Sequence, residues 1–95
     1  MAQYKLGMAY LDGIGVDQNS IIANHWLMIS ADQGTFFAQY QLAENYYFGI
    51  GCKQDIIKAK QMWLLSAEKG FEKSAVALEK YYDIYYMDEN KTFLA

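Results

Sequence analysis

Small and hydrophobic residues recur along this chain at intervals of three or four positions. Ala2, Leu6 and Tyr10 lie four residues apart, which places them on one face of a helix. Ile22 and Trp26 begin a second stripe with the same spacing. This spacing predicts an all-α chain of about five helices. The predicted helices span residues 2–12, 19–33, 38–48, 55–69 and 73–88.

Glycines and capping residues separate the predicted helices. The segments Gly13-Ile14-Gly15 and Gly49-Ile50-Gly51 follow the first and third helices. Glycine adopts the positive φ that a helix end requires, so two glycines in three positions predict a tight reversal. Asn19 and Asp55 then suit the N-caps of the second and fourth helices. Those two helices are expected to end at two further glycines, Gly34 and Gly70.

The pattern is an internal repeat with a period of 36 residues. Without a gap, residues 2–34 align with residues 38–70 and share 14 identities. After a further 36 residues, Ser74, Leu78 and Tyr82 occupy the positions of the first stripe, and then the match stops. A helix pair that buries its stripe against the next pair forms a quasi-one-dimensional stack. The chain is therefore expected to be one domain, 1–95, with repeat 1 at 2–37, repeat 2 at 38–73 and a partial repeat with a C-terminal cap helix at 74–95.

The repeat unit resembles the Sel-1-like repeat, a relative of the tetratricopeptide repeat. The resemblance rests on Ala-Gln-Tyr-x-Leu-Gly-x-x-Tyr-x-x-Gly-x-Gly-Val in residues 2–16. It also rests on Ala-x-x-Trp and Ser-Ala-Asp-x-Gly in residues 23–34. The chain departs from the usual pattern at Ala43, Cys52 and Met62, and none of these changes threatens the fold. The resemblance implies an α-α superhelix, or solenoid, of about two and a half helix-turn-helix repeats.

The same resemblance implies a non-catalytic protein–protein interaction module. Proteins of this kind are mostly adaptors, scaffolds or regulators, many of them bacterial, and some small ones are immunity proteins against secreted toxins. Three functions therefore stay open: an adaptor or regulator, an inhibitor of the toxin-immunity type, and a structural homo-oligomer or fragment of a longer repeat array. The expected partner is another protein.

Composition narrows the choice of partner and compartment. The formal net charge of the 95 residues is −3, without a run of lysine or arginine, which excludes the basic patch typical of nucleic-acid binding. No stretch approaches the roughly 18 apolar residues of a membrane span. A single cysteine cannot form an internal disulfide, which fits a reducing compartment. We therefore favour the cytoplasm, while a periplasmic or secreted location stays open if a signal peptide was removed.

The residues that usually carry catalysis are too few here. His25 and Cys52 are the only histidine and cysteine, and zinc requires several such ligands. A Cys-His nucleophile would also need a third, orienting group. We expect no catalytic residue, no metal and no cofactor.

The resemblance places the first helix of each repeat along a concave groove. Positions of these helices that lie off the Ala-Leu-Tyr stripe are expected to face a partner. The candidate partner-binding residues are Lys5, Met8, Asp12, Gln41, Glu44, Asn45, Phe48, Lys80 and Tyr81. Phe48 is a large apolar group beside a turn, and packing on Tyr47 or on the next helix is the alternative to an anchor role.

Four tyrosines stand close together near the end of the chain. Tyr81, Tyr82, Tyr85 and Tyr86 would form one broad aromatic face if the last helix continued through them. Tyrosine has an apolar body and a hydroxyl that tolerates water, which suits a terminal cap. A partner or dimer surface is the alternative.

Overall fold

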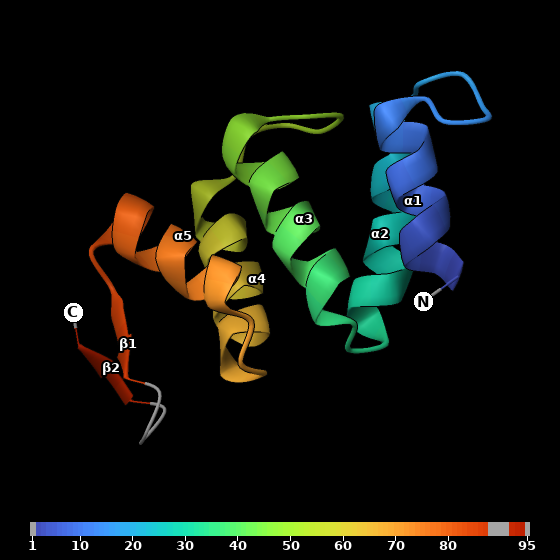
Figure 1. Ribbon diagram of the computed structural model, residues 1–95. Helices are drawn as coiled ribbons and strands as arrows, with labels where there is room; N and C mark the ends of the chain where they lie inside the picture. The colour runs from blue at the N-terminus through green and yellow to red at the C-terminus, as the bar shows by residue number, and fades with distance from the viewer. Residues whose placement is uncertain (1, 88–91, 95) are drawn as a thin grey trace.

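The computed structural model describes residues 2–87 and 92–94. Five α-helices lead into a short hairpin in this part of the chain (Figure 1). The elements are α1 (Ala2–Asp12), α2 (Ser20–Asp32), α3 (Phe36–Phe48), α4 (Ile56–Glu68), α5 (Glu72–Tyr82), β1 (Tyr85–Met87) and β2 (Thr92–Leu94). The predicted all-α superhelix of helix-turn-helix repeats is confirmed, and the two short strands are an addition to it.

The predicted caps start α2 and α4. The Asn19 side chain accepts hydrogen bonds from the backbone N–H groups of Ile21 and Ile22, each at 3.1 Å. Asp55 accepts one from the N–H of Lys58 at 2.9 Å. These bonds satisfy N–H groups that the first turn of a helix leaves free, so local sequence determines where both helices begin.

The third and fifth helices begin slightly earlier than the spacing predicted. α3 starts at Phe36 rather than at 38, and α5 starts at Glu72 rather than at 73. The reason is tertiary, because the rings of Phe36, Phe37 and Phe71 pack together with centroids 4.3 to 5.2 Å apart. This cluster joins the start of α3 to the loop before α5, so the aromatic residues that precede the stripe lie within the packed structure.

The repeat turns use glycine as predicted, and the two copies of the turn have different surroundings. Gly15 and Gly51 both adopt positive φ, at 77° and 70°. A Cβ atom built on Gly51 would lie 2.5 Å from the carbonyl oxygen of Ser20, whereas one on Gly15 would meet nothing within 4 Å. The turn of the second repeat therefore rests on the start of α2, while the turn of the first repeat is uncovered.

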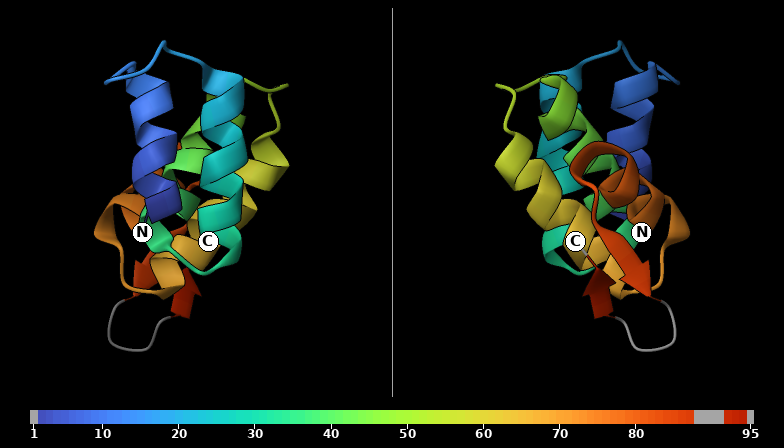
Figure 2. Two further views of the ribbon diagram at one scale, coloured as in Figure 1. Left: turned by 90° about the vertical axis from the view of Figure 1, so that its right-hand side faces the viewer. Right: turned by 90° about the vertical axis from the view of Figure 1, so that its left-hand side faces the viewer.

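The helices form two layers. α1, α3 and α5 make the front layer in Figure 1, and α2 and α4 lie behind them; the side views in Figure 2 agree. Each later first helix buries its stripe against the second helix of the preceding repeat. Leu42 of α3 is 2% exposed in a cluster with Leu27 of α2, and Leu78 of α5 is fully buried in a cluster with Trp63 of α4.

The stripe of α1 has no such cover among the described residues. Leu6, which is equivalent to Leu42, is 37% exposed, and Ala2 is exposed as well. The left panel of Figure 2 shows α1 and α2 side by side on this open side of the stack. The sequence predicted the stripe correctly, and burial of the stripe depends on whether another helix pair packs on it.

The prediction of a last helix over 73–88 is wrong, because α5 ends at Tyr82. Asp83 adopts the left-handed conformation with a φ of 55°, and its N–H donates to the carbonyl of Glu79. The N–H of Ile84 then donates to the carbonyl of Leu78 at 3.2 Å, and Ile84 packs back into the core. The bond from Asp83 to Glu79 is that of the αL type of helix end, with a polar residue in the place of glycine. Asp88, where the helix was expected to end, lies outside the described residues.

The early end of α5 also changes the predicted tyrosine face. Tyr81 and Tyr82 lie on the last turn of the helix, whereas Tyr85 and Tyr86 belong to β1. β1 pairs antiparallel with β2, with Tyr85 opposite Leu94. The four tyrosines therefore do not form one helical surface, and the hairpin is the element that follows α5.

Candidate functional site

We define the first-helix face as the surface of α1, α3 and α5 that points away from α2 and α4. Described residues line two hollows on this face. The α1 hollow, of about 320 Å³, lies along α1, and the α3–α5 hollow, of about 180 Å³, lies between α3 and α5. The 36-residue repeat relates them, because Tyr4 and Met8 of the first are equivalent to Tyr40 and Glu44 of the second.

The α1 hollow brings together three of the predicted partner-binding residues. They are Lys5 and Asp12, which are exposed, and Met8, which is half-buried. The hollow is lined by Tyr4, Lys5, Met8, Ala9, Asp12 and Ile14. The thioether of methionine and the ring of tyrosine adapt to apolar side chains of varied shape, so this hollow suits an apolar side chain of a partner.

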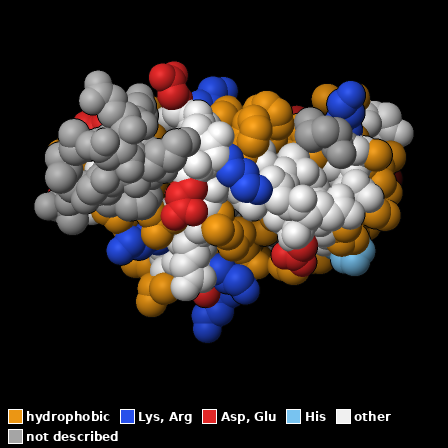
Figure 3. All heavy atoms as spheres, turned by 90° about the horizontal axis from the view of Figure 1, so that it is seen from below, with side chains coloured by type: hydrophobic (Ala, Val, Ile, Leu, Met, Phe, Trp, Pro, Cys, Tyr) orange, Lys and Arg blue, Asp and Glu red, His pale blue; other side chains and the backbone are white. Residues whose placement is uncertain are grey.

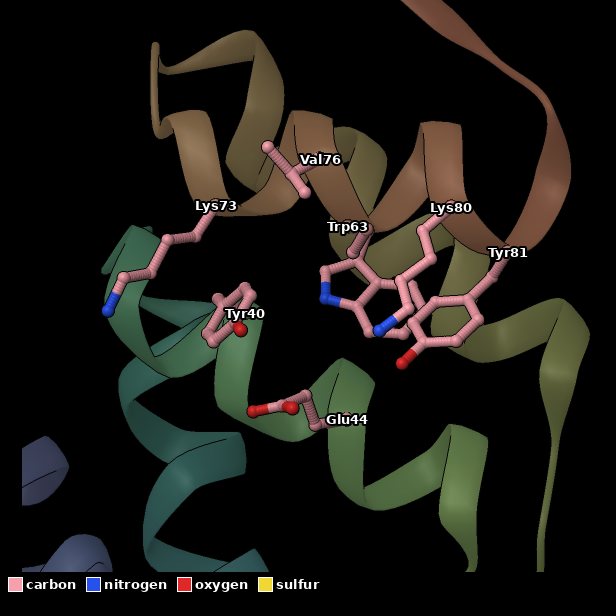
Figure 4. A pocket seen from close by; sticks show the side chains of 8 residues that line it. Tyr40, Glu44, Trp63, Lys73, Val76, Lys80 and Tyr81 are labelled. Carbon is pink, nitrogen blue, oxygen red and sulfur yellow. The ribbon is translucent and has the colours of Figure 1, made fainter.

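The α3–α5 hollow brings together three more of the predicted residues, Glu44, Lys80 and Tyr81 (Figure 4). The side chains around it come from α3, α4 and α5. The hollow is lined by Tyr40, Glu44, Trp63, Lys73, Val76, Ala77, Lys80 and Tyr81. It carries two lysines and one carboxylate, whereas the α1 hollow carries one lysine and one carboxylate, so it has an excess of positive charge and suits a polar or charged group.

Burial perturbs two titratable groups of this hollow. Desolvation raises the pKa of Glu44, and the nearby charge of Lys73 offsets part of that rise. The pKa of Tyr40 is also raised, mainly by burial and further by Glu44 and Tyr81. The ammonium of Lys80 lies over the ring of Tyr81, 5.2 Å from its centroid, in a cation–π arrangement.

Aromatic stacking holds Tyr81 in place. Its ring stacks on Trp63 with centroids 5.5 Å apart and planes 15° apart, and the Tyr47 ring lies 4.4 Å away on centroids. Trp63 is fully buried and belongs to the main core cluster. Tyr81 therefore has a structural role in addition to its place on the rim of the hollow.

The remaining predicted residues have different surroundings. Asn45 is fully buried, so its prediction as a groove-facing residue is wrong. Its amide donates to the side chain of Asn24 at 2.6 Å, and Asn24 donates to the carbonyl of Ile50 at 2.8 Å. This chain of bonds ties α3 to α2 and to the following turn, which explains why a polar residue is buried there. Gln41 is half-buried and donates to Asn45 at 3.2 Å.

Phe48 remains accessible although it has aromatic neighbours. Its ring contacts Tyr47 with centroids 5.0 Å apart and Tyr81 with centroids 6.0 Å apart, as the packing alternative expected. Even so, 52% of Phe48 is exposed. An exposed ring held by two neighbouring rings is pre-organised to contact a further surface.

The predicted partner-binding residues leave out several side chains that line the two hollows. Among them are Tyr4, Tyr40, Trp63, Lys73 and Val76. Tyr4 and Tyr40 were visible as an identity of the repeat and could have been found from it. Trp63 comes from a second helix and reaches between two first helices, so no single-helix pattern could place it there.

His25 and Cys52, the two residues considered for catalysis, contact different residues. His25 is exposed and packs edge-on against Trp26 at 5.4 Å. The thiol of Cys52 faces the carbonyl of Asn45 at 3.5 Å, and burial, with a smaller contribution from Asp55, raises its pKa. A raised pKa disfavours the thiolate, which is the nucleophilic form.

The described part of the chain contains neither a cluster of metal-ligating side chains nor a helix that could cross a membrane. Within residues 2–87 and 92–94, no three His, Cys, Asp or Glu side chains are grouped so that they could hold a metal ion. Over the same residues, no helix has the length and apolar character needed to span a membrane. Seen from below in Figure 3, lysines and acidic residues are interspersed with small hydrophobic clusters, so this side shows no large area of one charge.

Comparison with known proteins identifies the repeat. The family model of the Sel1 repeat matches residues 1–35 and again residues 37–71. No curated protein matches the chain in sequence. Family members are generally protein–protein interaction modules and non-catalytic scaffolds.

Two solved bacterial structures are similar to this chain. A Sel1 repeat protein from Oxalobacter formigenes is 32% identical with a TM-score of 0.82, over 83% of this chain and 32% of its own. The antigen c5321, described as a protective antigen present in uropathogenic Escherichia coli strains and displaying an SLR fold, is 35% identical with a TM-score of 0.77, over 83% of this chain and 18% of its own. This chain therefore spans a third or less of either relative. With both repeats matched and the fold shared, the chain belongs to the Sel1 repeat family.

Proposed function

We propose that this chain is a non-catalytic binding module that holds a partner protein on its first-helix face. The observation that carries the proposal is the pair of hollows at repeat-equivalent positions of α1 and α3. A partner that crosses the stack can place one group in each hollow. The general role of the family in protein–protein interaction supports this reading.

Phe48 is the anchor that this proposal makes most testable. It projects from the end of α3, and its two aromatic neighbours restrict its ring. Aromatic residues dominate interface energetics when a partner buries them, and removing one such residue costs about 2 kcal/mol or more of binding free energy. Tyr81 is a poorer test, because its stacking on Trp63 means that Tyr81→Ala would also disturb the core.

The experiment is affinity capture followed by a measurement of Kd. The purified chain is used as bait with lysate of the source cell, the captured partner is identified by mass spectrometry, and its Kd is measured for the wild type and Phe48→Ala. We expect the variant to weaken binding by about 30-fold, which corresponds to about 2 kcal/mol. The matched control is Ile21→Ala on α2, because Ile21 is 71% exposed and lies in the other layer of helices.

The outcome distinguishes this face from the rest of the surface. Equal affinity of Phe48→Ala and wild type, with both proteins folded, would remove Phe48 from the site. Loss of binding in Ile21→Ala alone would move the site to the second helices. The identity of the partner decides between a bacterial adaptor or regulator and a toxin-immunity type of inhibitor, since a secreted toxin as partner supports the latter.

A structural role is the second candidate, and the uncovered stripe of α1 favours it. The equivalent positions in α3 and α5 are buried by neighbouring helices, so the surface around Leu6 has the shape to accept another helix pair. Light scattering of the purified chain over a range of concentrations tests self-association. Leu6→Glu should then dissociate any oligomer, because it places a charge in the centre of this surface. A monomer at all concentrations would rule out assembly of copies through this surface.

A further inference from the structure

The floor of the α3–α5 hollow contains a hydrogen-bond donor without an acceptor. Trp63 is fully buried, and its indole nitrogen Nε1 has no hydrogen-bond partner among the described residues. In Figure 4 the nitrogen-bearing edge of the indole points toward the side of the hollow where Tyr40 lies. Buried donors are nearly always paired in folded proteins, so an unpaired donor at a hollow indicates an acceptor that arrives from outside.

Positive charge prevails around this donor. Lys73 and Lys80 line the hollow together with a single carboxylate, that of Glu44. Lys73 is the lysine whose charge acts on Glu44, so these two groups largely offset each other. The ammonium of Lys80 lies over the ring of Tyr81, and it can turn toward a ligand because the side chain is exposed.

The hollow has room for a carboxyl group and a short stem. Its volume of about 180 Å³ is several times the 30 Å³ or so that one water molecule occupies in the liquid. The indole nitrogen is shielded from solvent in this structure, so an acceptor reaches it when side chains that line the hollow shift. Lys80 and Val76 line the hollow and are exposed, and a rotamer change in an exposed residue is fast and requires no change in the helices.

The first repeat shows that these donors are specific to the second hollow. Leu27 stands 36 residues before Trp63, and Glu44 stands 36 residues before Lys80. One repeat earlier, these two positions therefore carry neither an indole N–H nor an ammonium, and the lysine of the α1 hollow, Lys5, occupies a different position of the repeat. The two hollows share their place in the repeat and differ in the chemistry that they offer.

We propose that the α3–α5 hollow binds a carboxylate of the partner, with the indole N–H of Trp63 and the ammonium of Lys80 as donors. The carboxylate belongs either to an acidic side chain or to the end of a chain. This assignment rests on the proposed function, because it names the group that the first-helix face recognises. The apolar α1 hollow would then receive a hydrophobic side chain of the same partner.

The test follows the indole N–H signals of the ¹⁵N-labelled chain by NMR. The chain has two tryptophans, so Trp26, which lies on α2 away from the hollow, is an internal control. The probes are acetyl-glutamate N-methylamide, its neutral isostere acetyl-glutamine N-methylamide, and acetyl-glycine with a free main-chain carboxylate. We expect the glutamate probe to shift the Trp63 signal in a saturable way and to leave Trp26 unchanged. The glutamine probe should bind about tenfold more weakly, because charge-assisted hydrogen bonds are roughly twice as strong as neutral ones.

A variant pair tests the role of Lys80. Lys80→Met should weaken the glutamate probe about fivefold, which is the upper range for an exposed ion pair. Lys53→Met is the control, since Lys53 is exposed in the turn before α4 and does not line the hollow. A dispersed Trp63 signal in both variants shows that they are folded. A tighter response to acetyl-glycine than to the glutamate probe would assign the carboxylate to a chain end.

Three results would overturn the assignment: equal binding of the glutamate and glutamine probes, equal shifts at both indoles, or no shift of the Trp63 signal up to the solubility limit. The partner assay separates this failure from that of the proposed function. If the probes fail while Phe48→Ala still weakens partner binding, only the carboxylate assignment is lost. If the glutamate probe binds while Phe48→Ala leaves partner binding unchanged, the carboxylate assignment of the hollow is supported and the proposed role of the first-helix face is refuted.

Discussion

The repeat offers a direct test of how stacking stabilises this chain, through Leu42 and Leu6. The two leucines are related by the 36-residue shift and occupy the same position on α3 and α1. Leu42 is 2% exposed and packs with Leu27 and Ala38, whereas Leu6 is 37% exposed. Replacing each by alanine makes the same chemical change in two different surroundings, so helix propensity cancels in the comparison.

The structure gives the expected magnitudes. Replacing a buried leucine by alanine loses the favourable free energy of burying the removed atoms and leaves a cavity. Together these cost about 2–5 kcal/mol of the free energy of unfolding. For Leu42→Ala, in a small core with little capacity to collapse, we expect a loss of about 3 kcal/mol in the free energy of unfolding. For Leu6→Ala we expect about 1 kcal/mol or less, because solvent already covers much of the side chain. A domain of 95 residues has roughly 5–14 kcal/mol in total, so only the first loss is severe.

Urea denaturation followed by circular dichroism measures both losses. At an unchanged slope with denaturant, the midpoint should fall clearly for Leu42→Ala and slightly for Leu6→Ala. Leu78→Ala, at the fully buried third copy of the position, should behave like Leu42→Ala. Equal losses at Leu6 and Leu42 would refute the reasoning, because they would mean that α1 is covered in solution as α3 is.

Two further predictions concern a glycine pair and the hydroxyl of the half-buried Tyr82. Gly51→Ala should destabilise the chain by about 1–3 kcal/mol more than Gly15→Ala in the same urea assay. Both positions have positive φ, but only the methyl group at Gly51 would clash with the backbone of Ser20. Equal losses of stability in the two variants would contradict this contact. The pKa of Tyr82 is raised from about 10 to about 12, mainly by burial, and its hydroxyl donates to the carbonyl of Ile56 at 2.5 Å. Since the folded state favours the protonated form of Tyr82, this contribution to stability is present below pH 10 and is lost as the pH rises from about 10 to 12. Tyr82→Phe should therefore lessen the fall in stability over that range. An unchanged pH profile of stability in the variant would count against the raised pKa.

Local chemistry made much of the fold predictable. Asn19 and Asp55 cap helices in the structure as their side chains predict, because the atoms that cap a helix lie within three residues along the chain. The glycine turns were predictable for the same reason, since positive φ is a local property of the backbone. The end of α5 at Asp83 was missed, because aspartate adopts the left-handed conformation less often than glycine and the burial of Ile84 that supports it is tertiary.

The candidate site was predictable only in part. Lys5, Met8 and Asp12 do share one hollow, because successive turns of one helix determine which of its residues are neighbours. Helical spacing also placed Asn45 on the surface, and the structure buries it, because its bond to Asn24 joins two helices that no local pattern relates.

The sequence by itself determined the repeat, the helix type, the caps and the turns, all of which follow from interactions within a few residues and from identities at a constant shift. Only the tertiary structure decided which equivalent positions are buried. Leu6 and Leu42 are the same residue in the same repeat position, yet one is open and the other is in the core. Likewise, only packing of α4 between α3 and α5 brings the indole of Trp63 to the α3–α5 hollow. Burial and the convergence of side chains from different helices depend on neighbours distant in the chain, and a pattern read along one helix holds no information about them.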